Sequence, residues 1–409
     1  MVQIYRNKWR QNFFWSLGCY LRDSVVLWLP VRKLPKWLIR TLYGEEISFA
    51  FFVHPRSYQD VFIPLPFFSW IKLIFRREQA YRFFSSLNPF VLNQVITPHK
   101  VRGLVIAQPT LPEVMFERRK ETLAHLKKMI GFIGKISRPH AVIGLGGWFP
   151  MVCSRGSALE ETARDHSLIV TNGHCGTLAS IYLTVERIAE IGKMNLSDLA
   201  IAVIGVGKMG TNVARALNGK VGKITLIDIS EPNVRRARTI LETSEQSTEI
   251  DVFLTGSDKR PLRDVLGMHH VGVCATSTFR NLLKLKDMPA GFIAIDDSRP
   301  EALPRDPKNE RIILEGGLLK IHGAKIDYDY GFGKDDNVFG CLGEAFILAL
   351  SRGSIEPTLG EVDLKNFFEF LSFCKRNNVS AGDFKSAECC ISENEIYEAL
   401  EKRKRFTDK

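Results

Sequence analysis

The hydrophobic and polar positions of this chain follow two alternating periods. Short apolar runs between glycine or polar residues predict buried strands at 47–53, 101–107, 141–145 and 201–204. Apolar residues at helical spacing predict amphipathic helices at 113–136 and from about 178 to about 192. Strands that alternate with helices are typical of parallel sheets covered by helices. We therefore expect an α/β protein.

The strongest local signal follows the strand at 201–204. The chain continues into Gly205-x-Gly207-x-x-Gly210 and a helix that runs to Leu217. Gly205 would allow a tight turn, Gly207 would let the backbone approach a pyrophosphate, and Gly210 would let helix and strand pack closely. The pyrophosphate would lie at the helix N-terminus, where free N–H groups favour anions. This pattern predicts a dinucleotide site.

A second strand, 224–227, ends at Asp228, roughly 20 residues after the glycines. A carboxylate there accepts hydrogen bonds from the adenosine ribose and repels a 2′-phosphate, which favours NAD(H) over NADP(H). Loops at the carboxyl ends of parallel strands face the ligand, so the segments 269–278 and 291–297 belong to the same unit. The residues expected to bind the cofactor are Gly205, Gly207, Lys208, Met209, Gly210, Asp228, Ala275, Thr276 and Ser277.

We expect a Rossmann-type doubly wound parallel sheet, a second α/β substrate domain and helical terminal extensions. The predicted divisions are an N-terminal extension (1–46), a substrate and catalytic domain (47–194), a dinucleotide-binding domain (195–335) and a C-terminal helical segment (336–409). Cys274, inside an apolar strand, is expected in the core, and His269 and His270 before it on the surface.

The net charge of the 409 residues is +11, which favours acidic partners such as an anionic membrane or an acidic carrier protein. No recognised nucleic-acid module accompanies this charge, so we expect no nucleic acid partner. Eight scattered cysteines lack the spacing of a zinc site, so no metal is expected. Reduced thiols indicate a cytoplasmic protein.

Two stretches combine aromatic and apolar residues. In residues 1–46, tryptophans lie beside basic residues, which suits a segment in a membrane interface; the alternative is a helical pair packed on the main domain. The stretch 61–75 could line an apolar pocket or belong to the core. We find no secretory signal and no uninterrupted apolar run long enough to cross a membrane.

Cys341 is the candidate nucleophile. It lies near the start of a predicted helix, where the helix dipole lowers a thiol pKa, and Glu344 would share its helix face and could exchange a proton. The alternative is a small residue that fills a gap between helices. His54 and His174, in loops after strands, are candidate catalytic groups whose alternative is a structural hydrogen bond.

The order of several short motifs resembles the cyanobacterial long-chain acyl-[acyl-carrier-protein] reductases, which make fatty aldehydes. The similarity runs from about residue 47 to about 385. The motifs are His54-x-x-Ser57, Leu111-Pro112-Glu113 with Arg118-Arg119, Leu145-Gly146-Gly147-Trp148, Thr171-Asn172-Gly173 with Thr177, the three glycines of the dinucleotide loop, Gly316-Gly317, and Cys341-Leu342-Gly343-Glu344-Ala345.

The resemblance implies that Cys341 takes an acyl chain as a thioester from acyl-carrier protein or acyl-CoA, and that a nicotinamide cofactor reduces it to the aldehyde. It also implies that Thr177 and Gly173 lie near the reacting carbonyl. His54 matches an early histidine of the family, and its role stays open. The family resembles NADPH users with a basic residue where this chain has Asp228, so NADP(H) remains the alternative cofactor. The family's loop also carries an asparagine followed by a histidine, where this chain reads His174-Cys175-Gly176, so the groups around the carbonyl differ.

Two other functions fit the same residues. One is an NAD-dependent dehydrogenase of a small hydroxy acid or semialdehyde without covalent catalysis, in which Cys341 would be dispensable. The other is a non-catalytic NAD-binding sensor at a membrane, in which case the cytoplasmic protein would be peripheral to that membrane.

Overall fold

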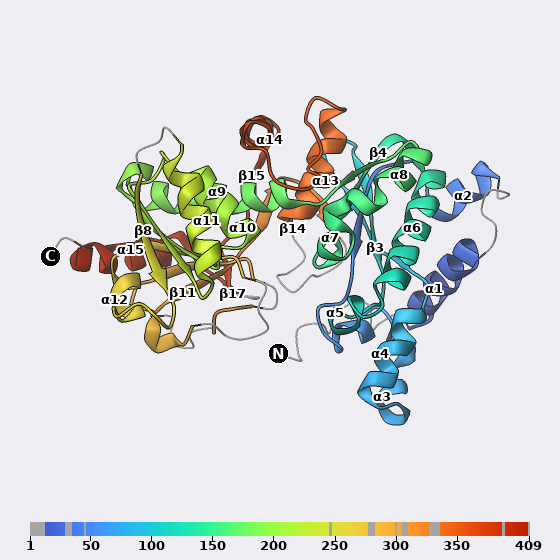
Figure 1. Ribbon diagram of the computed structural model, residues 1–409. Coiled ribbons are helices and arrows are strands. Elements are labelled where there is room, and N and C mark those ends of the chain that lie inside the picture. Colours follow the sequence, from blue (N-terminus) through green and yellow to red (C-terminus); the bar gives the residue numbers. More distant parts are fainter. Residues whose placement is uncertain are drawn as a thin grey trace. The chain divides into compact units, whose positions relative to one another are not determined.

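The computed structural model describes residues 13–28, 35–44, 46–244, 248–276, 283–298, 301–304, 310–326, 336–386 and 389–407. The chain forms two compact units (Figure 1). Unit 1 comprises Met1–Gly173, Ile321–Asp336 and Cys341–Glu361, and unit 2 comprises His174–Lys320, Asn337–Gly340 and Val362–Lys409.

Unit 2 is built on a six-stranded sheet in the order β11-β10-β9-β6-β7-β8. Every pairing in this sheet is parallel. Counted along the chain, this is the 3-2-1-4-5-6 order of a Rossmann sheet, the fold type that the sequence predicted. The strands are β6 (Ala200–Ile204), β7 (Lys223–Asp228), β8 (Glu249–Leu254), β9 (Val271–Cys274), β10 (Ile293–Asp296) and β11 (Ile312–Glu315).

The helices of unit 2 are α9 (His174–Ile191), α10 (Lys208–Leu217), α11 (Glu231–Glu242), α12 (Leu262–Gly267), α14 (Leu364–Arg376) and α15 (Glu393–Thr407), with 3-10 turns Leu196–Asp198 and Leu285–Asp287. Two small sheets complete it. One has the order β14-β12-β15 (Asn337–Phe339, Leu318–Ile321, Val379–Ala381), and the other pairs β16 (Lys385–Ser386) with β17 (Cys389–Cys390).

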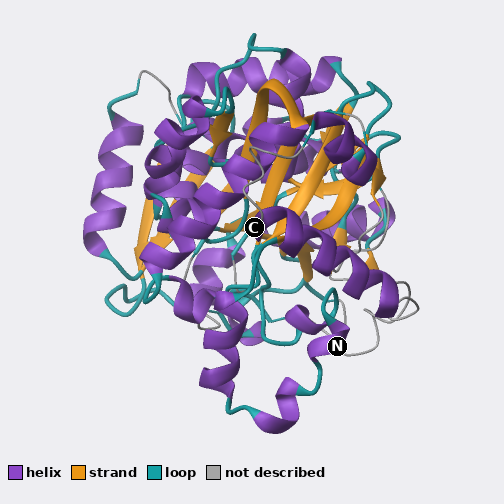
Figure 2. Cartoon of the chain, turned by 90° about the vertical axis from the view of Figure 1, so that its right-hand side faces the viewer, coloured by secondary structure: helices purple, strands orange, loops and turns teal. Residues whose placement is uncertain are grey.

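Unit 1 contains a second six-stranded sheet in the order β13-β2-β3-β1-β4-β5. The strands β3, β1, β4 and β5 run parallel, and β2 and β13 are antiparallel to their neighbours. The strands are β1 (Ile47–Val53), β2 (Phe90–Ile96), β3 (Arg102–Ala107), β4 (Ser137–Leu145), β5 (Ile169–Thr171) and β13 (Lys325–Ile326). Helices pack against the strands of this α/β protein (Figure 2).

The helices of unit 1 are α1 (Phe13–Trp28), α2 (Lys36–Tyr43), α3 (Ile71–Ile74), α4 (Arg77–Ser86), α5 (Pro112–Met115), α6 (Arg119–Ile136), α7 (Phe149–Val152), α8 (Ser157–Asp165) and α13 (Gly340–Ser351). The 3-10 turns are η4 (Asp60–Phe62), η5 (Pro66–Phe68) and η6 (Ser154–Gly156). Its core includes Leu126, Ile130, Ile143 and Phe149.

The boundaries between the units differ from those expected at 194/195 and 335/336. The first boundary falls at Gly173, because α9 packs on α10 and α14 of unit 2 rather than on the sheet that precedes it. The expected C-terminal segment 336–409 is divided, since 341–361 belongs to unit 1 and 362–409 to unit 2. Sequence periodicity shows that a helix has an apolar face but does not show which sheet that face covers.

In the described part of the N-terminal extension, α1 and α2 pack on unit 1. Asp23 is 1% exposed, and its carboxylate accepts hydrogen bonds from the Tyr43 hydroxyl (2.8 Å), the Val91 N–H (2.7 Å) and Arg22 Nε (2.8 Å). Burial raises the pKa of this carboxyl. The packed helical pair is thus the observed arrangement. Among the described residues, no helix combines the length and apolar character needed to cross a membrane.

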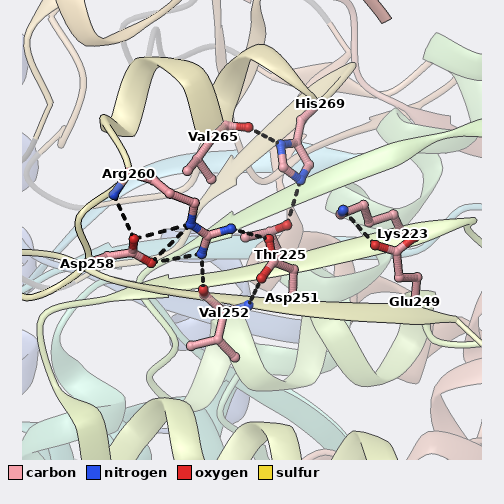
Figure 3. Close-up of polar contacts among 9 residues, drawn as sticks. All are labelled: Lys223, Thr225, Glu249, Asp251, Val252, Asp258, Arg260, Val265 and His269. Atoms are coloured by element: carbon pink, nitrogen blue, oxygen red, sulfur yellow. Dashed lines mark hydrogen bonds and ion pairs between the residues drawn. The ribbon is translucent and has the colours of Figure 1, made fainter.

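His269 and His270 are buried, which corrects the expectation that they lie on the surface. His269 Nδ1 donates to the Val265 carbonyl (2.7 Å), so Nε2 accepts from the Thr225 hydroxyl (2.7 Å; Figure 3). His270 Nδ1 accepts from the Ala200 N–H (3.1 Å). Burial lowers the pKa of His269 to about 4, so the ring is neutral and connects α12 to β7. These bonds hold both histidine rings inside unit 2.

Candidate functional site

The turn after β6 needs glycine at its first position. Gly205 has a φ of +86°, and a Cβ there would lie 2.9 Å from the Ala275 carbonyl oxygen. Ala275 follows β9, the strand on the other side of β6 from β7. The loops after β6 and β9 therefore meet where the strand order reverses, which is where Rossmann sheets bind dinucleotides.

The other two glycines have opposite surroundings. A Cβ at Gly210 would lie 2.0 Å from the Gly205 carbonyl oxygen, so only glycine allows α10 to start this close to β6. A Cβ at Gly207 would meet nothing within 4 Å. Gly207 precedes α10, whose first residues are Lys208 and Met209. The start of α10 beside Gly207 thus borders open space, which suits a pyrophosphate.

Asp228 ends β7 and lies beside this loop. Its Oδ2 accepts the Val206 N–H (2.6 Å) and its Oδ1 accepts the Ser230 N–H (2.8 Å). Each carboxylate oxygen can accept a further hydrogen bond, as a ribose hydroxyl requires. Thr276 donates its N–H to the Ser298 hydroxyl (3.2 Å). Ser277, also expected at this site, lies outside the described residues. The loop and its acid thus fit a dinucleotide.

Cys341 lies in the first turn of α13 and is partly exposed. Its nearest surroundings in unit 1 are small: a Cβ at Gly173 would lie 2.3 Å from the Cys341 Cβ, and one at Gly144 would lie 3.5 Å from the Cys341 carbonyl oxygen. Gly173 has a φ of +78° and follows β5, and Gly144 lies in β4. The cysteine therefore packs directly against backbone at the carboxyl end of the unit 1 sheet.

Glu344 is 1% exposed and accepts a hydrogen bond from the Thr171 hydroxyl at the end of β5. Thr171 Oγ1 also lies 3.2 Å from the carbonyl oxygen and 3.2 Å from the N–H of Thr358. This network fixes α13 to β5 and so fixes the place of Cys341. No sequence signal pointed to Thr358, and Thr171 stood out only within the resemblance.

His54 has both ring nitrogens engaged. Nε2 accepts the Trp148 N–H (2.9 Å), so Nδ1 carries the proton and donates to the Pro55 carbonyl (2.9 Å). Burial lowers the pKa of His54 to about 4. A neutral ring held at both nitrogens is suited to positioning the Gly146-Gly147-Trp148 turn rather than to moving a proton.

The remaining two candidates lie in unit 2. His174 and Thr177 are in the first turn of α9 and are partly exposed. A Cβ at Gly340 would lie 2.8 Å from the Thr177 Cα, so α9 begins against the residue that precedes Cys341 in the chain. Unit 1 thus brings together Cys341, Glu344 and Gly173, whereas His174 and Thr177 belong to the other unit. Within the described ranges, no group of three or more His, Cys, Asp or Glu side chains could hold a metal ion.

No protein-family model and no curated protein matches this chain. Among solved structures, L-tryptophan dehydrogenase from Nostoc punctiforme is 11% identical over 90% of each chain, with a TM-score of 0.37. Shikimate 5-dehydrogenase from Thermus thermophilus, in complex with NADP(H) and shikimate, is 11% identical over 79% of this chain and 98% of that one, with a TM-score of 0.33.

One component of the dipicolinate synthase from Bacillus halodurans is 15% identical, with a TM-score of 0.27; the match covers 42% of this chain and 56% of that component. The chain therefore spans little more than half of that component's length. The assignment of the fold rests on the strand order of the two six-stranded sheets.

Proposed function

We propose that this chain is a nicotinamide-dependent oxidoreductase that reduces a long-chain acyl thioester to the fatty aldehyde, with Cys341 as nucleophile. One observation carries the proposal: Cys341 lies in the first turn of α13, at the carboxyl ends of the parallel strands β4 and β5, packed on Gly173. Functional groups of α/β proteins gather at this edge. The motif order, which resembles the acyl-[acyl-carrier-protein] reductases, supplies the substrate class.

The position of Cys341 favours the reactive form of its thiol. The N-terminus of a helix carries a partial positive charge, which stabilises a thiolate relative to the thiol. The buried Glu344–Thr171 contact holds the first turns of α13 on β5, so the sulfur is presented from a fixed backbone. A nucleophile on a rigid element keeps its geometry through the reaction.

The chemistry has two parts. The Cys341 thiolate attacks the thioester carbonyl carbon; a new C–S bond forms, the bond to the carrier sulfur breaks, and the carrier leaves as a thiolate that takes up a proton. A nicotinamide cofactor supplies hydride for the reduction of this acyl group. When the aldehyde leaves, the bond between Cys341 Sγ and the acyl carbon breaks and its electron pair stays on the sulfur.

Unit 2 supports the cofactor part of the proposal. The surroundings of Gly205, Gly207 and Gly210 suit a pyrophosphate loop, and the carboxylate of Asp228 beside it would accept the ribose hydroxyls. The carboxylate favours NAD(H), and NADP(H) is the alternative. The proposed acyl donors are acyl-carrier protein and acyl-CoA; the net charge of +11 suits the acidic surface of a carrier protein.

A dehydrogenase without covalent catalysis is the second candidate, and one observation favours it. Cys341 Cβ packs so closely on Gly173 that the cysteine also suits a purely structural role as a small side chain between helix and loop. In that case the same dinucleotide loop would serve a small hydroxy acid or semialdehyde, and Cys341→Ala would leave turnover nearly unchanged.

Intact-protein mass spectrometry tests the proposal. Wild type, Cys341→Ser and the control Cys389→Ser, which changes an exposed cysteine of unit 2, are incubated with a long-chain acyl-carrier protein or acyl-CoA. NADH or NADPH is then added separately, and aldehyde is measured.

We expect an acyl adduct on wild type and on Cys389→Ser, none on Cys341→Ser, and discharge of the adduct as aldehyde by one of the two cofactors. If Cys341→Ser oxidises a hydroxy acid as fast as wild type and no adduct forms, the second candidate is correct. NADH binding without any turnover would overturn both.

A further inference from the structure

The segment 61–75 belongs only in part to the core. Val61, Leu65 and Ile71 are buried, as the sequence allowed. Trp70, Leu73 and Ile74 are 45%, 87% and 71% exposed. We call these three side chains the apolar tip. Single exposed apolar residues are ordinary, but three large ones within five positions indicate a contact surface.

Packed aromatic residues support the apolar tip. It belongs to α3 and the residue before it, at the lower end of unit 1 in Figure 1 and at the same end in Figure 2. Beneath it, the ring of Phe75 stacks on Phe83, with centroids 6.2 Å apart, and Phe83 contacts Phe84 at 5.5 Å. These aromatic contacts hold α3 on α4. The apolar tip is therefore exposed although the helix that carries it is packed.

The charges around the tip are mostly positive. Between residues 69 and 82 the chain carries Lys72, Arg76, Arg77 and Arg82 against a single acid, Glu78, and all five are exposed. Lys72 Nζ contacts Gln59 Oε1 at 3.0 Å, and Arg77 lies 3.8 Å from Glu113. The tip therefore combines tryptophan and aliphatic side chains with a cationic border, a composition typical of segments that enter a membrane interface.

The neighbouring helix α1 exposes a second apolar face. Phe14, Leu21 and Val25 are 85%, 52% and 54% exposed, at helical spacing along one side. The buried side of the helix carries Tyr20 and Val26 together with Asp23. The exposed side of a helix on a soluble domain normally carries polar residues. The ring of Phe13 packs on that of Phe67 in η5, with centroids 6.1 Å apart. This contact attaches α1 to the turns that lead into α3.

We propose that the apolar tip, with α1 beside it, binds the surface of an anionic phospholipid bilayer. Trp70, Leu73 and Ile74 enter the boundary between headgroups and acyl chains, and Arg76 and Arg82 attract the anionic headgroups. The cationic border selects this partner over a second copy of the chain, because two such borders would repel each other. The inference concerns binding alone and does not rest on the proposed reductase activity.

Co-sedimentation of the full chain with vesicles tests this surface. The vesicles contain either phosphatidylcholine alone or phosphatidylcholine with phosphatidylglycerol. The test variants are Leu73→Gln/Ile74→Gln for the apolar tip and Arg76→Gln/Arg82→Gln for the charges. Their matched controls lie in unit 2: Ile240→Gln/Met268→Gln, which changes exposed apolar residues, and Arg236→Gln/Arg263→Gln, which changes exposed cations.

We expect wild type and both controls to bind the anionic vesicles and to bind phosphatidylcholine alone more weakly. The Leu73→Gln/Ile74→Gln variant should lose about tenfold or more in binding to anionic vesicles, because two apolar side chains are removed from the interface. The Arg76→Gln/Arg82→Gln variant should lose the preference for anionic lipid.

All side chains changed are exposed, so the variants should fold, which their circular dichroism and unfolding temperature check. Equal vesicle binding by the tip variant and wild type would overturn the proposal. A second result would also overturn it: wild type does not bind vesicles but is a dimer in light scattering, and the tip variant is a monomer. The apolar tip would then be a contact between two copies of the chain.

Discussion

Gly207→Ala separates the role of the dinucleotide loop in binding from its role in folding. Gly207 has a φ of −70° and a ψ of −155°, an extended conformation about 25° beyond the usual β range of an L-residue, and a Cβ there meets no atom within 4 Å. The free energy of unfolding should therefore change by no more than about 1 kcal/mol. The added methyl group would project into the space through which a pyrophosphate reaches the start of α10.

The expected loss of affinity follows from this steric conflict. Forcing an extra methyl group into a close contact typically costs about 1–3 kcal/mol. Applied to the bound state alone, this corresponds to a Kd for NADH that is roughly 5- to 150-fold higher. NADH binding is measured by titration calorimetry, and stability by urea unfolding of the same preparations without cofactor.

Two further glycines serve as controls. Gly267→Ala adds a methyl group that also meets no atom within 4 Å, at the end of α12, and should leave both NADH affinity and stability near the wild-type values. Gly210→Ala would place Cβ 2.0 Å from the Gly205 carbonyl oxygen and should destabilise the apo protein. Unchanged NADH affinity in Gly207→Ala, with Gly267→Ala behaving normally, would refute the assignment of this loop.

Three other predictions concern buried polar groups. Thr171→Val removes the hydroxyl that donates to Glu344 and should lower the free energy of unfolding by about 1.5–3 kcal/mol in urea titrations. Asp23→Ala leaves the Tyr43 hydroxyl without its acceptor and should cost about 3–5 kcal/mol in thermal unfolding, more than Asp23→Asn, which retains an acceptor oxygen. His269 has a folded-state pKa of about 4, below its ordinary value, so its contribution to stability is complete at neutral pH and is lost as the pH falls from about 6.5 towards 4; urea unfolding at pH 7 and pH 5 should differ more for wild type than for His269→Gln.

Each of these predictions has a result that contradicts it. A Thr171→Val protein as stable as wild type would show that the contact with Glu344 does not hold α13. Equal losses in Asp23→Ala and Asp23→Asn would mean that charge, and not hydrogen bonding, anchors the N-terminal helices. A pH dependence that is the same in wild type and His269→Gln would assign the acid sensitivity to other groups.

The sequence alone determined the features that depend only on residues close together in the chain. The strand, the three glycines, the helix and the acid at 201–228 form one local unit, and its geometry depends on backbone freedom that only glycine provides. Gly205 adopts a positive φ and Gly210 has no space for a Cβ, as their places in the pattern predicted. The alternation of strands and helices predicted a parallel sheet of the Rossmann type, and the structure supplied its strand order.

The tertiary structure decided which partner each apolar or polar surface has. The helix α9 has an apolar face in the sequence, but only folding assigns it to unit 2. Burial of His269 required Thr225, far away in the sequence, to supply its hydroxyl. The exposure of Leu73 and Ile74 could not be predicted either, because an apolar run has the same sequence pattern whether it is buried or exposed. Periodicity shows which residues are apolar, and only long-range packing determines which of them are buried.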